Sequence, residues 1–248
     1  MRPIIIIDPG HGGRDPGGGS NTYWEEKDLN LEISLYQYQR FHDLGIKTIV
    51  TRDDDVTLEP ITRAKIVRDS GAIYCISNHI NAGGGEGAEV IYSIYGNQNL
   101  AQKLLDGIVV EGMPRRGIFT RALPQDPKHD YYFMHRETGA VETFIVEYGF
   151  ADNARDVTRL KKNWKKYAEG VVKVMVEYLG VKYVPPKPKE EQLQMEKIKV
   201  SIHGQQKEIE GFKKDGMNYI PIRFLEQLGY KVDWDSSTET VYIDYRKE

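Results

Sequence analysis

Ile4-Ile5-Ile6-Ile7-Asp8-Pro9-Gly10-His11-Gly12-Gly13 is the most informative segment of this 248-residue chain. Four successive isoleucines are typical of a buried β-strand, and Asp-Pro-Gly ends that strand abruptly. The glycines on both sides of His11 let other groups approach the imidazole closely. The segment therefore predicts a buried strand that leads into a glycine-rich loop carrying a histidine with metal-binding chemistry.

Further strands and helices alternate along the next 170 or so residues. Apolar spacing and stop signals predict helices over 26–44, from Pro60 to about 68, around 97–111 and over 163–179. Apolar runs predict strands over 46–51, 72–77, 90–94 and 144–147. This alternation indicates an α/β fold, with a mostly parallel or mixed sheet flanked by helices on both faces.

Four residues with metal or acid–base chemistry fall where such a sheet collects reactive groups. His11, His79 and Glu147 lie at or just after predicted strand ends, and Glu26 opens the first helix. Two imidazoles and one carboxylate leave zinc an open coordination position, which is the arrangement of catalytic zinc. A further carboxylate then serves as general base and later as general acid. Together the four residues suggest a zinc hydrolase.

Each residue alone also has a structural explanation. A single histidine after a strand, such as His11 or His79, is more often a loop histidine than a ligand. Glu26 complements the dipole of its helix, and Glu147 is a candidate for a paired core carboxylate. A nucleotide pocket is disfavoured, because the glycine fingerprint requires a third glycine where Asp15 stands and no Lys-Ser or Lys-Thr completes a P-loop.

Composition excludes several classes of partner. Up to Gly180 the chain carries 22 Lys+Arg against 25 Asp+Glu, and the remainder carries 12 against 12. Neither part is basic enough to bind nucleic acid or an anionic membrane by bulk charge. No apolar run is long enough to span a bilayer, and Ile4–Ile7 is too short for a signal peptide. Cys75, the single cysteine, excludes an intramolecular disulfide and fits a reducing compartment.

The domain plan follows from a change in composition near residue 183. Residues 183–193 contain a Pro/Lys/Glu-rich linker segment, Pro185-Pro186-Lys187-Pro188-Lys189-Glu190-Glu191. We therefore expect a catalytic domain over 1–182, a linker over 183–193 and a small α+β module over 194–248. A module of this size is near the lower limit for folding without disulfides.

An ordered set of motifs over residues 3 to about 180 resembles the zinc-dependent N-acetylmuramoyl-L-alanine amidases, the type-3 amidase family of bacterial autolysins and phage lysins. The resemblance implies that His11, Glu26 and His79 hold Zn²⁺ and that Glu147 is the catalytic acid/base. The motifs are Ile7–Gly13 with Asp15-Pro16-Gly17, Glu26–Leu31, Thr51-Arg52, Arg63-Ala64, Ser77–Ala82, Arg116-Gly117-Ile118 and Val146–Phe150 with Asn153.

The chain departs from the family pattern at a few positions. Asn78 stands where a small or apolar residue is usual, and Ile80 where alanine is usual. The stretch 123–130 looks like an insertion or a remodelled loop before the last motif. Glu25 adjoins Glu26, and Lys27-Asp28-Leu29 after it favours Glu26 as the ligand.

Residues 197–245 resemble a second module, the small N-terminal domain of copper amine oxidases, through Tyr219–Asp235 and Thr240–Ile243. In an amidase the resemblance suggests a cell-wall-binding attachment without copper chemistry. Four aromatic residues, Tyr230, Trp234, Tyr242 and Tyr245, are candidates for stacking on sugars, although core packing is the usual role of most such residues.

The implied reaction is hydrolysis of the amide between the lactyl group of N-acetylmuramic acid and L-alanine in bacterial peptidoglycan. A phage lysin is the favoured role: made in the host cytoplasm without a signal peptide, released by a separate phage pore protein, and active at the cell wall. The alternatives are a host autolysin of the same activity, a zinc peptidase or deacetylase on peptidoglycan, and a non-catalytic wall-binding protein. No nucleic-acid partner and no membrane insertion are expected.

Overall fold

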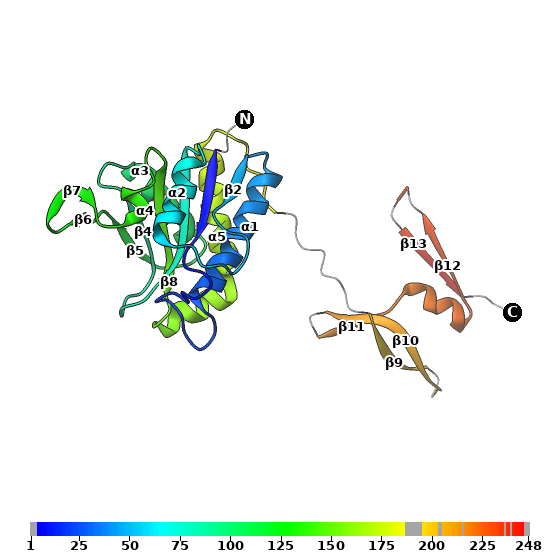
Figure 1. Ribbon diagram of the computed structural model, residues 1–248. Helices are drawn as coiled ribbons and strands as arrows, with labels where there is room; N and C mark the ends of the chain where they lie inside the picture. The colour runs from blue at the N-terminus through cyan, green and yellow to red at the C-terminus, as the bar shows by residue number, and fades with distance from the viewer. Residues whose placement is uncertain are drawn as a thin grey trace. The chain divides into compact units, whose positions relative to one another are not determined.

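The computed structural model describes residues 4–186, 195–202, 205–214, 216–235, 237–238 and 240–245. The chain divides into two compact units, Met1–Pro186 and Lys187–Glu248, and each is considered by itself (Figure 1). Residues 187–193 of the predicted linker lie outside the described part of the chain. No helix among the described residues combines the length and apolar character needed to cross a membrane.

The first unit is built on a six-stranded sheet in the order β2-β1-β3-β8-β4-β5. Neighbouring strands are parallel, except that β4 runs antiparallel to β8. The predicted fold class, a mixed sheet with helices on both faces, is confirmed. The strands are β1 (Ile5–Pro9), β2 (Thr48–Val50), β3 (Tyr74–Asn81), β4 (Ala88–Tyr92), β5 (Arg115–Phe119) and β8 (Glu142–Phe150).

The period-two alternation of the strands divides the core between the two faces of the sheet. Ile5 and Ile7 of β1 pack with the helices α1 (Glu26–Asp43), α3 (Gln98–Val110) and α5 (Ala154–Tyr178). Ile6 faces the other way, toward α2 (Pro60–Asp69) and α4 (Phe133–Arg136). The same alternation places Glu147 of β8 on the α2/α4 face, because Val146 lies in the first core cluster and Ile145 in the second.

Several elements are longer than the sequence predicts. β3 continues through His79 instead of ending before it, β8 has nine residues, and α5 starts at Ala154. The side chain of Asn153 caps α5 by accepting hydrogen bonds from the backbone N–H groups of Arg155 and Asp156. The apolar pattern of α5 is readable only from its second half onward, because its first turns carry mainly polar residues.

The stretch between α3 and His135, for which the sequence predicts no helix or strand, contains regular elements. It holds β5, a short hairpin of β6 (Ala122–Leu123) and β7 (Asp126–Asp130), and the single-turn helix α4. This hairpin includes the stretch 123–130, which departs from the family pattern. Its base is anchored because the buried carboxylate of Asp130 accepts hydrogen bonds from the Ser93 hydroxyl and the Ile94 N–H.

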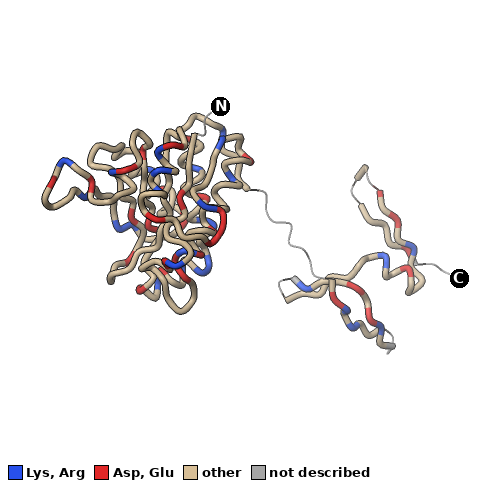
Figure 2. Tube along the Cα trace, in the orientation of Figure 1, with Lys and Arg blue, Asp and Glu red and all other residues tan. Residues whose placement is uncertain are grey.

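The second unit consists of a three-stranded antiparallel sheet, a 3₁₀ helix and a β-hairpin. Trp234 and Tyr242 of the hairpin are 54% and 51% exposed, so their rings are available to a ligand. Lys/Arg and Asp/Glu residues are interspersed along the described chain (Figure 2). The elements are β9 (Glu196–Ile202), β10 (Gln205–Lys214), β11 (Met217–Tyr219), η1 (Ile222–Leu228), β12 (Tyr230–Asp235) and β13 (Thr240–Tyr245).

Candidate metal and acid–base site

His11 enters the site from a tight loop after β1. Its φ of 62° lies in the left-handed region, which is uncommon for a residue other than glycine and costs backbone energy. Three carbonyl groups of this loop accept hydrogen bonds from two buried arginines. Arg52 donates to the carbonyl oxygens of Pro9 and Gly10, and Arg63 donates to those of Pro9 and His11. These bonds hold the strained loop in place.

Glu26 approaches the same point from the first turn of α1. Its carboxylate is almost fully buried, with 2% of the residue exposed. One oxygen, Oε2, accepts a hydrogen bond from the Gly19 N–H at 2.7 Å, and Oε1 accepts one from the Ile80 N–H at 3.0 Å. Two backbone donors, one in the glycine-rich loop before α1 and one in β3, therefore fix the orientation of the carboxylate.

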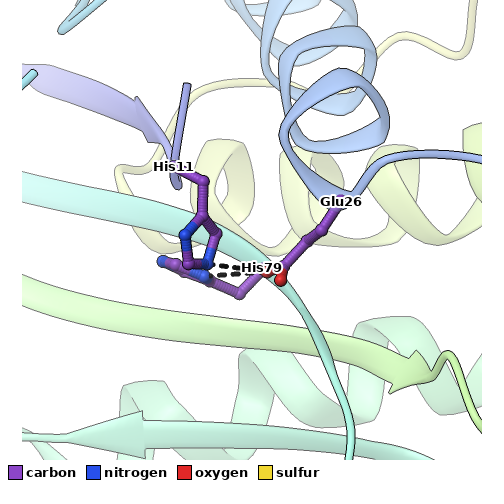
Figure 3. Close-up of side chains that lie close together, drawn as sticks. All are labelled: His11, Glu26 and His79. Carbon is purple, nitrogen blue, oxygen red and sulfur yellow. Dashed lines mark hydrogen bonds and ion pairs between the residues drawn. The ribbon is translucent and has the colours of Figure 1, made fainter. Parts of the chain in front are cut away.

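His79, in β3, completes the cluster. Its Nδ1 lies 3.1 Å from Oε1 of Glu26, and Nε2 of His11 lies 3.3 Å from the same oxygen (Figure 3). The two imidazole rings meet edge to face with their centroids 5.0 Å apart. A side chain at Gly10 would overlap the ring of His79, so glycine is required there for the loop to pass the imidazole.

The donor set fits a zinc ion. His11, Glu26 and His79 each offer one ligand atom, and these atoms all lie within 4.8 Å of one another. Nitrogen and oxygen ligands lie about 2.0–2.1 Å from a tetrahedral zinc, and therefore about 3.4 Å from one another. The distances from Oε1 of Glu26 to Nε2 of His11 and to Nδ1 of His79, 3.3 and 3.1 Å, are close to this value. Two histidines and one carboxylate are also the ligand count of catalytic zinc sites. The three predicted ligand residues therefore lie together in an arrangement that suits the metal.

Asp15 orients His11 from outside the cluster. Its Oδ2 lies 2.7 Å from Nδ1 of His11, which leaves Nε2 facing Glu26. Carboxylates commonly hold metal-binding histidines in this way. Burial opposes a charge on His11, but hydrogen bonds and charges from Glu26 and Asp15 outweigh it and raise the pKa of His11 to about 9. The surroundings of this imidazole thus favour a cation at its position.

Glu147 lies beside the cluster but makes a different set of contacts. It is paired in register with His79 on β3 and with Glu89 on β4. Its Oε2 is buried without a hydrogen-bond partner among the described residues. Burial raises the pKa of Glu147 to about 7, and the charges of Glu26 and Glu89 add to the rise while His79 opposes it. The carboxyl group can therefore both accept and return a proton near neutral pH.

A cleft of about 530 Å³ lies beside this cluster on the α2/α4 side of the sheet, and His11, His79 and Glu147 line it. One wall comes from the His11 loop and the residues before α2, and includes Arg14 and Thr57. The other wall is formed by β8 and α4, with Tyr132 and Phe133 on its surface. His79 lies on β3, between β1 and β8 in the sheet, so the candidate site forms the floor of an open groove.

The buried ion pair behind the His11 loop should be important for stability. Asp8 is fully buried, and its Oδ1 lies 2.6 Å from Nη1 of Arg63. We expect Arg63→Met to lower the free energy of unfolding by about 3–5 kcal/mol, because it leaves the Asp8 carboxylate uncompensated. Urea denaturation measures the effect. The double variant Asp8→Asn/Arg63→Met should lose less stability than Arg63→Met alone, and simple additivity of the single effects would contradict this explanation.

Asn78, the departure from the family pattern next to His79, belongs to a buried polar network on the opposite face of β3. Its Nδ2 donates to the Ser34 hydroxyl and to Oε1 of Gln37, both at 2.8 Å. Its Oδ1 accepts from the Tyr148 hydroxyl, which in turn accepts from Nε2 of Gln37. The network joins α1, β3 and β8, the three elements that carry Glu26, His79 and Glu147.

Other residues with reactive side chains lie away from the cluster. Cys75 is buried in the second core cluster, and its pKa is raised by burial. Arg115 and Arg116 form ion pairs with Asp106 and Glu89. The adjacent Glu25 is exposed and pairs with Lys27, so Glu26 is the carboxylate that faces the histidines.

His135 is buried in α4 and should make stability depend on pH. Burial lowers its pKa to about 4, whereas an unfolded chain would bind the proton near the ordinary value of 6.5. Below pH 6.5 the unfolded state therefore binds more protons, and the free energy of unfolding should fall by about 2 kcal/mol between pH 7.5 and pH 5 through this residue. Urea denaturation in the presence of a chelator tests this.

The His135 prediction depends on a comparison of variants. His135→Phe should remove most of that pH dependence, whereas His129→Gln should retain it, because His129 lies on the exposed hairpin beside Asp126. An unchanged slope in His135→Phe would show that other groups carry the pH dependence.

The sequence motifs contain Asp15, Arg52 and Arg63 but do not by themselves indicate what these three residues do. The spacing of His11 and Asp15, four residues apart, does not by itself predict their contact, because a glycine turn and not a helix brings the two side chains together. The arginines act on backbone carbonyls, which no side-chain pattern reveals.

Comparisons with known proteins identify relatives of both units. The family model described as N-acetylmuramoyl-L-alanine amidase matches residues 5–177, and the copper amine oxidase N-terminal domain model matches residues 173–243. Both matches agree with the resemblances inferred from the motifs.

Curated relatives and a solved structure cover the same region. The chain is 31% identical to the N-acetylmuramoyl-L-alanine amidase CwlM of Bacillus licheniformis over 64% of its own length, and spans 61% of that protein. It is 30% identical to the germination-specific N-acetylmuramoyl-L-alanine amidase of Bacillus subtilis, covering 74% of this chain and 82% of the relative. It is also 30% identical to the endolysin of Bacillus phage SPP1, covering 73% and 68%. The catalytic domain of CwlV from Bacillus (Paenibacillus) polymyxa var. colistinus superimposes with a TM-score of 0.64 and 26% identity, over 73% of this chain and 100% of that domain.

Proposed function

Since the chain belongs to the N-acetylmuramoyl-L-alanine amidase family, we propose that it hydrolyses the amide bond between the lactyl group of N-acetylmuramic acid and L-alanine in peptidoglycan, with zinc as cofactor. The observation that carries the proposal is the convergence of His11, Glu26 and His79 in one cluster, beside a cleft that Glu147 also lines. Family membership supports an enzyme of this class, and the donor set supports the choice of metal.

The roles of the residues follow from their contacts. His11, Glu26 and His79 would hold the zinc, and Asp15 would keep Nε2 of His11 turned toward it. When bound, zinc supplies Lewis-acid chemistry that polarises the scissile carbonyl and acidifies the attacking water. Glu147 takes the proton of the attacking water and then returns it to the departing nitrogen of L-alanine, so that one carboxyl group acts first as base and then as acid.

The environment of Glu147 supports this double role. Its Oε2 has no hydrogen-bond partner among the described residues, so no internal bond of this atom competes with proton transfer, and Glu147 is one of the residues that line the cleft. A general acid–base group works best when its pKa lies near the working pH, and burial raises the pKa of Glu147 to about 7. A carboxylate engaged in an internal ion pair would be a poorer proton carrier.

For the domain plan we propose a catalytic domain over 1–182, a linker over 183–193 and a wall-binding module over 194–248. The exposed rings of Trp234 and Tyr242 support a surface that stacks on sugars. Sedimentation of the full chain with purified sacculi tests the module: Trp234→Ala/Tyr242→Ala should release protein into the supernatant while soluble muropeptides are still cleaved.

We further propose that the protein acts as a phage lysin, made in the host cytoplasm, released through a phage pore protein and active at the cell wall. The similarity to the SPP1 endolysin supports this role, whereas the similarity to the germination-specific amidase supports a host autolysin. Purified protein added to growing Bacillus cells and to spore-cortex sacculi separates the two. Rapid clearing of growing cells favours the lysin, and activity confined to cortex favours the host enzyme.

Digestion of purified peptidoglycan followed by mass spectrometry tests the proposed reaction. We expect stem peptides with a free L-alanine amine and intact glycan strands, loss of products with a zinc chelator, and recovery when zinc is restored. Cleavage within the stem peptide, or deacetylation of the glycan, would keep the metal site and overturn the proposed bond. Zinc binding without any cleavage would indicate a wall-binding protein instead.

A further inference from the structure

Arg14 is unusual among the described arginines of the first unit because its guanidinium has no ion-pair or hydrogen-bond partner among the described residues. The other described arginines of this unit, apart from Arg121, form ion pairs with carboxylates or, for Arg52, donate to backbone carbonyls. Arg121 stacks on the ring of Tyr131, outside the cleft lining. Of the arginines that the structure describes in this unit, Arg14 alone combines an unpaired guanidinium with a position on the wall of the cleft.

The backbone that carries Arg14 is rigidly held. Gly12 and Asp15 exchange two backbone hydrogen bonds, at 3.1 and 3.2 Å, so that Arg14 sits at the tip of a two-residue turn. The turn is tied to the next loop because the Gly13 N–H donates to Oδ1 of Asp55 and the Arg14 N–H donates to Oγ1 of Thr57. A fixed base with a free cationic end is the arrangement of a recognition group rather than of a structural one.

Carboxylates near the turn are already occupied. Asp15 accepts from His11, and Asp55 is engaged by Lys27 and by the Gly13 N–H. Asp8, deeper in the cleft, is paired with Arg63. Glu59 also lines the cleft but forms no ion pair with Arg14. The charge of Arg14 is therefore available to an anionic ligand.

The proposed substrate carries its negative charge on one side of the scissile bond. The glycan side is uncharged once the lactyl group is in amide linkage, whereas the peptide side continues from L-alanine to a D-glutamate joined through its side chain, which leaves an α-carboxylate. A peptide advances about 3.5 Å per residue, so this carboxylate lies about 7 Å from the scissile carbonyl. That span is comparable with the reach of an arginine on the wall beside His11.

We infer that Arg14 recognises the α-carboxylate of the second residue of the stem peptide and makes the enzyme prefer substrates in which that group is free over those in which it is amidated. The inference rests on the proposed function. Guanidinium groups bind carboxylates with two parallel hydrogen bonds, and an amide offers neither the charge nor the second acceptor. The apolar wall of Tyr132 and Phe133, contributed by the far side of the cleft, would contact the uncharged parts of the substrate.

The test uses the zinc-loaded full chain and two soluble muropeptides that differ only in amidation of this α-carboxylate. We expect wild type to cleave the free acid with a kcat/KM about fivefold or more above that of the amide, mainly through KM, because the contact is made far from the reacting atoms. Arg14→Gln should cleave both substrates at the rate of the amide, and Arg14→Lys should recover part of the preference.

The control is Arg115→Gln, which removes the same charge from β5. Arg115 is paired with Asp106, and its replacement should keep the wild-type preference. Equal cleavage of the two muropeptides by wild type, or a preference that persists in Arg14→Gln, would overturn the inference while the amidase activity stands. Failure of wild type to release a stem peptide with a free L-alanine amine from either muropeptide would overturn the proposed function itself, together with the inference.

Discussion

Glu147→Gln should reduce kcat by about 10²–10⁴-fold while leaving zinc binding and folding intact, which is the range expected for loss of a general acid–base group. The amide has the same size as the carboxyl group, so the cleft keeps its shape. The amide, however, cannot take a proton from water and return it to the departing amine. Because Oε2 has no hydrogen-bond partner among the described residues, the substitution breaks no hydrogen bond of this atom within that part of the chain.

Three measurements on one preparation check this prediction: release of stem peptides, zinc content and the thermal unfolding midpoint. Glu142→Gln is the matched control, since Glu142 lies at the opposite end of the same strand and accepts a hydrogen bond from the Asn97 N–H. Near wild-type turnover in Glu147→Gln would contradict the assigned role. Loss of zinc together with turnover would make Glu147 a ligand instead.

Much of the fold follows from local sequence signals. The isoleucine run before Asp8 is buried in β1, Gly45 with its positive φ follows the end of α1, and Pro60 opens α2, because each of these signals acts within a few residues. The lengths of the helices and strands are harder to predict from local sequence. β3 extends through His79 because β1 and β8 pair on either side of it, and that pairing comes from distant parts of the chain.

The site is predictable from the sequence only in part, for a similar reason. Motif order and chemistry suggest His11, Glu26, His79 and Glu147 as a group, and the structure brings the first three within 4.8 Å of one another. The supporting contacts were not predictable, since Arg63 donates to the carbonyl of His11 across 52 residues of chain. Such bonds depend on backbone positions that exist only after the sheet has formed.

Asn78 shows how a departure from a family pattern is accommodated. A buried amide without partners would be costly, and here Ser34, Gln37 and Tyr148 provide donors and acceptors for it. The polar residue on β3 is thus matched by polar residues on α1 and β8. The substitution therefore has its explanation on the side of the sheet away from His79.

Glu26→Gln should abolish tight zinc binding. The substitution removes the anionic donor between His11 and His79 but keeps the size of the side chain. Loss of a residue that merely orients a ligand typically weakens metal binding by about 10–100-fold, so loss of the carboxylate itself should exceed about 100-fold. Titration against a chromophoric chelator measures the affinity. Thermal unfolding gives a second readout, because zinc at about 100 times its Kd would stabilise wild type by about 2.7 kcal/mol and the variant by far less.

The neighbouring residue provides the control for this prediction. Glu25→Gln removes the same charge one position earlier, from a carboxylate that is exposed and paired with Lys27, and should retain wild-type zinc affinity. The pair of variants tests the ligand assignment at a place where the sequence alone leaves a one-residue ambiguity. If Glu25→Gln lost zinc and Glu26→Gln kept it, the carboxylate that α1 holds against the histidines would not be the ligand, and the buried cluster would need another explanation. If only Glu26→Gln loses zinc, the hydrogen bonds from Gly19 and Ile80 explain why this carboxylate is the one fixed in place.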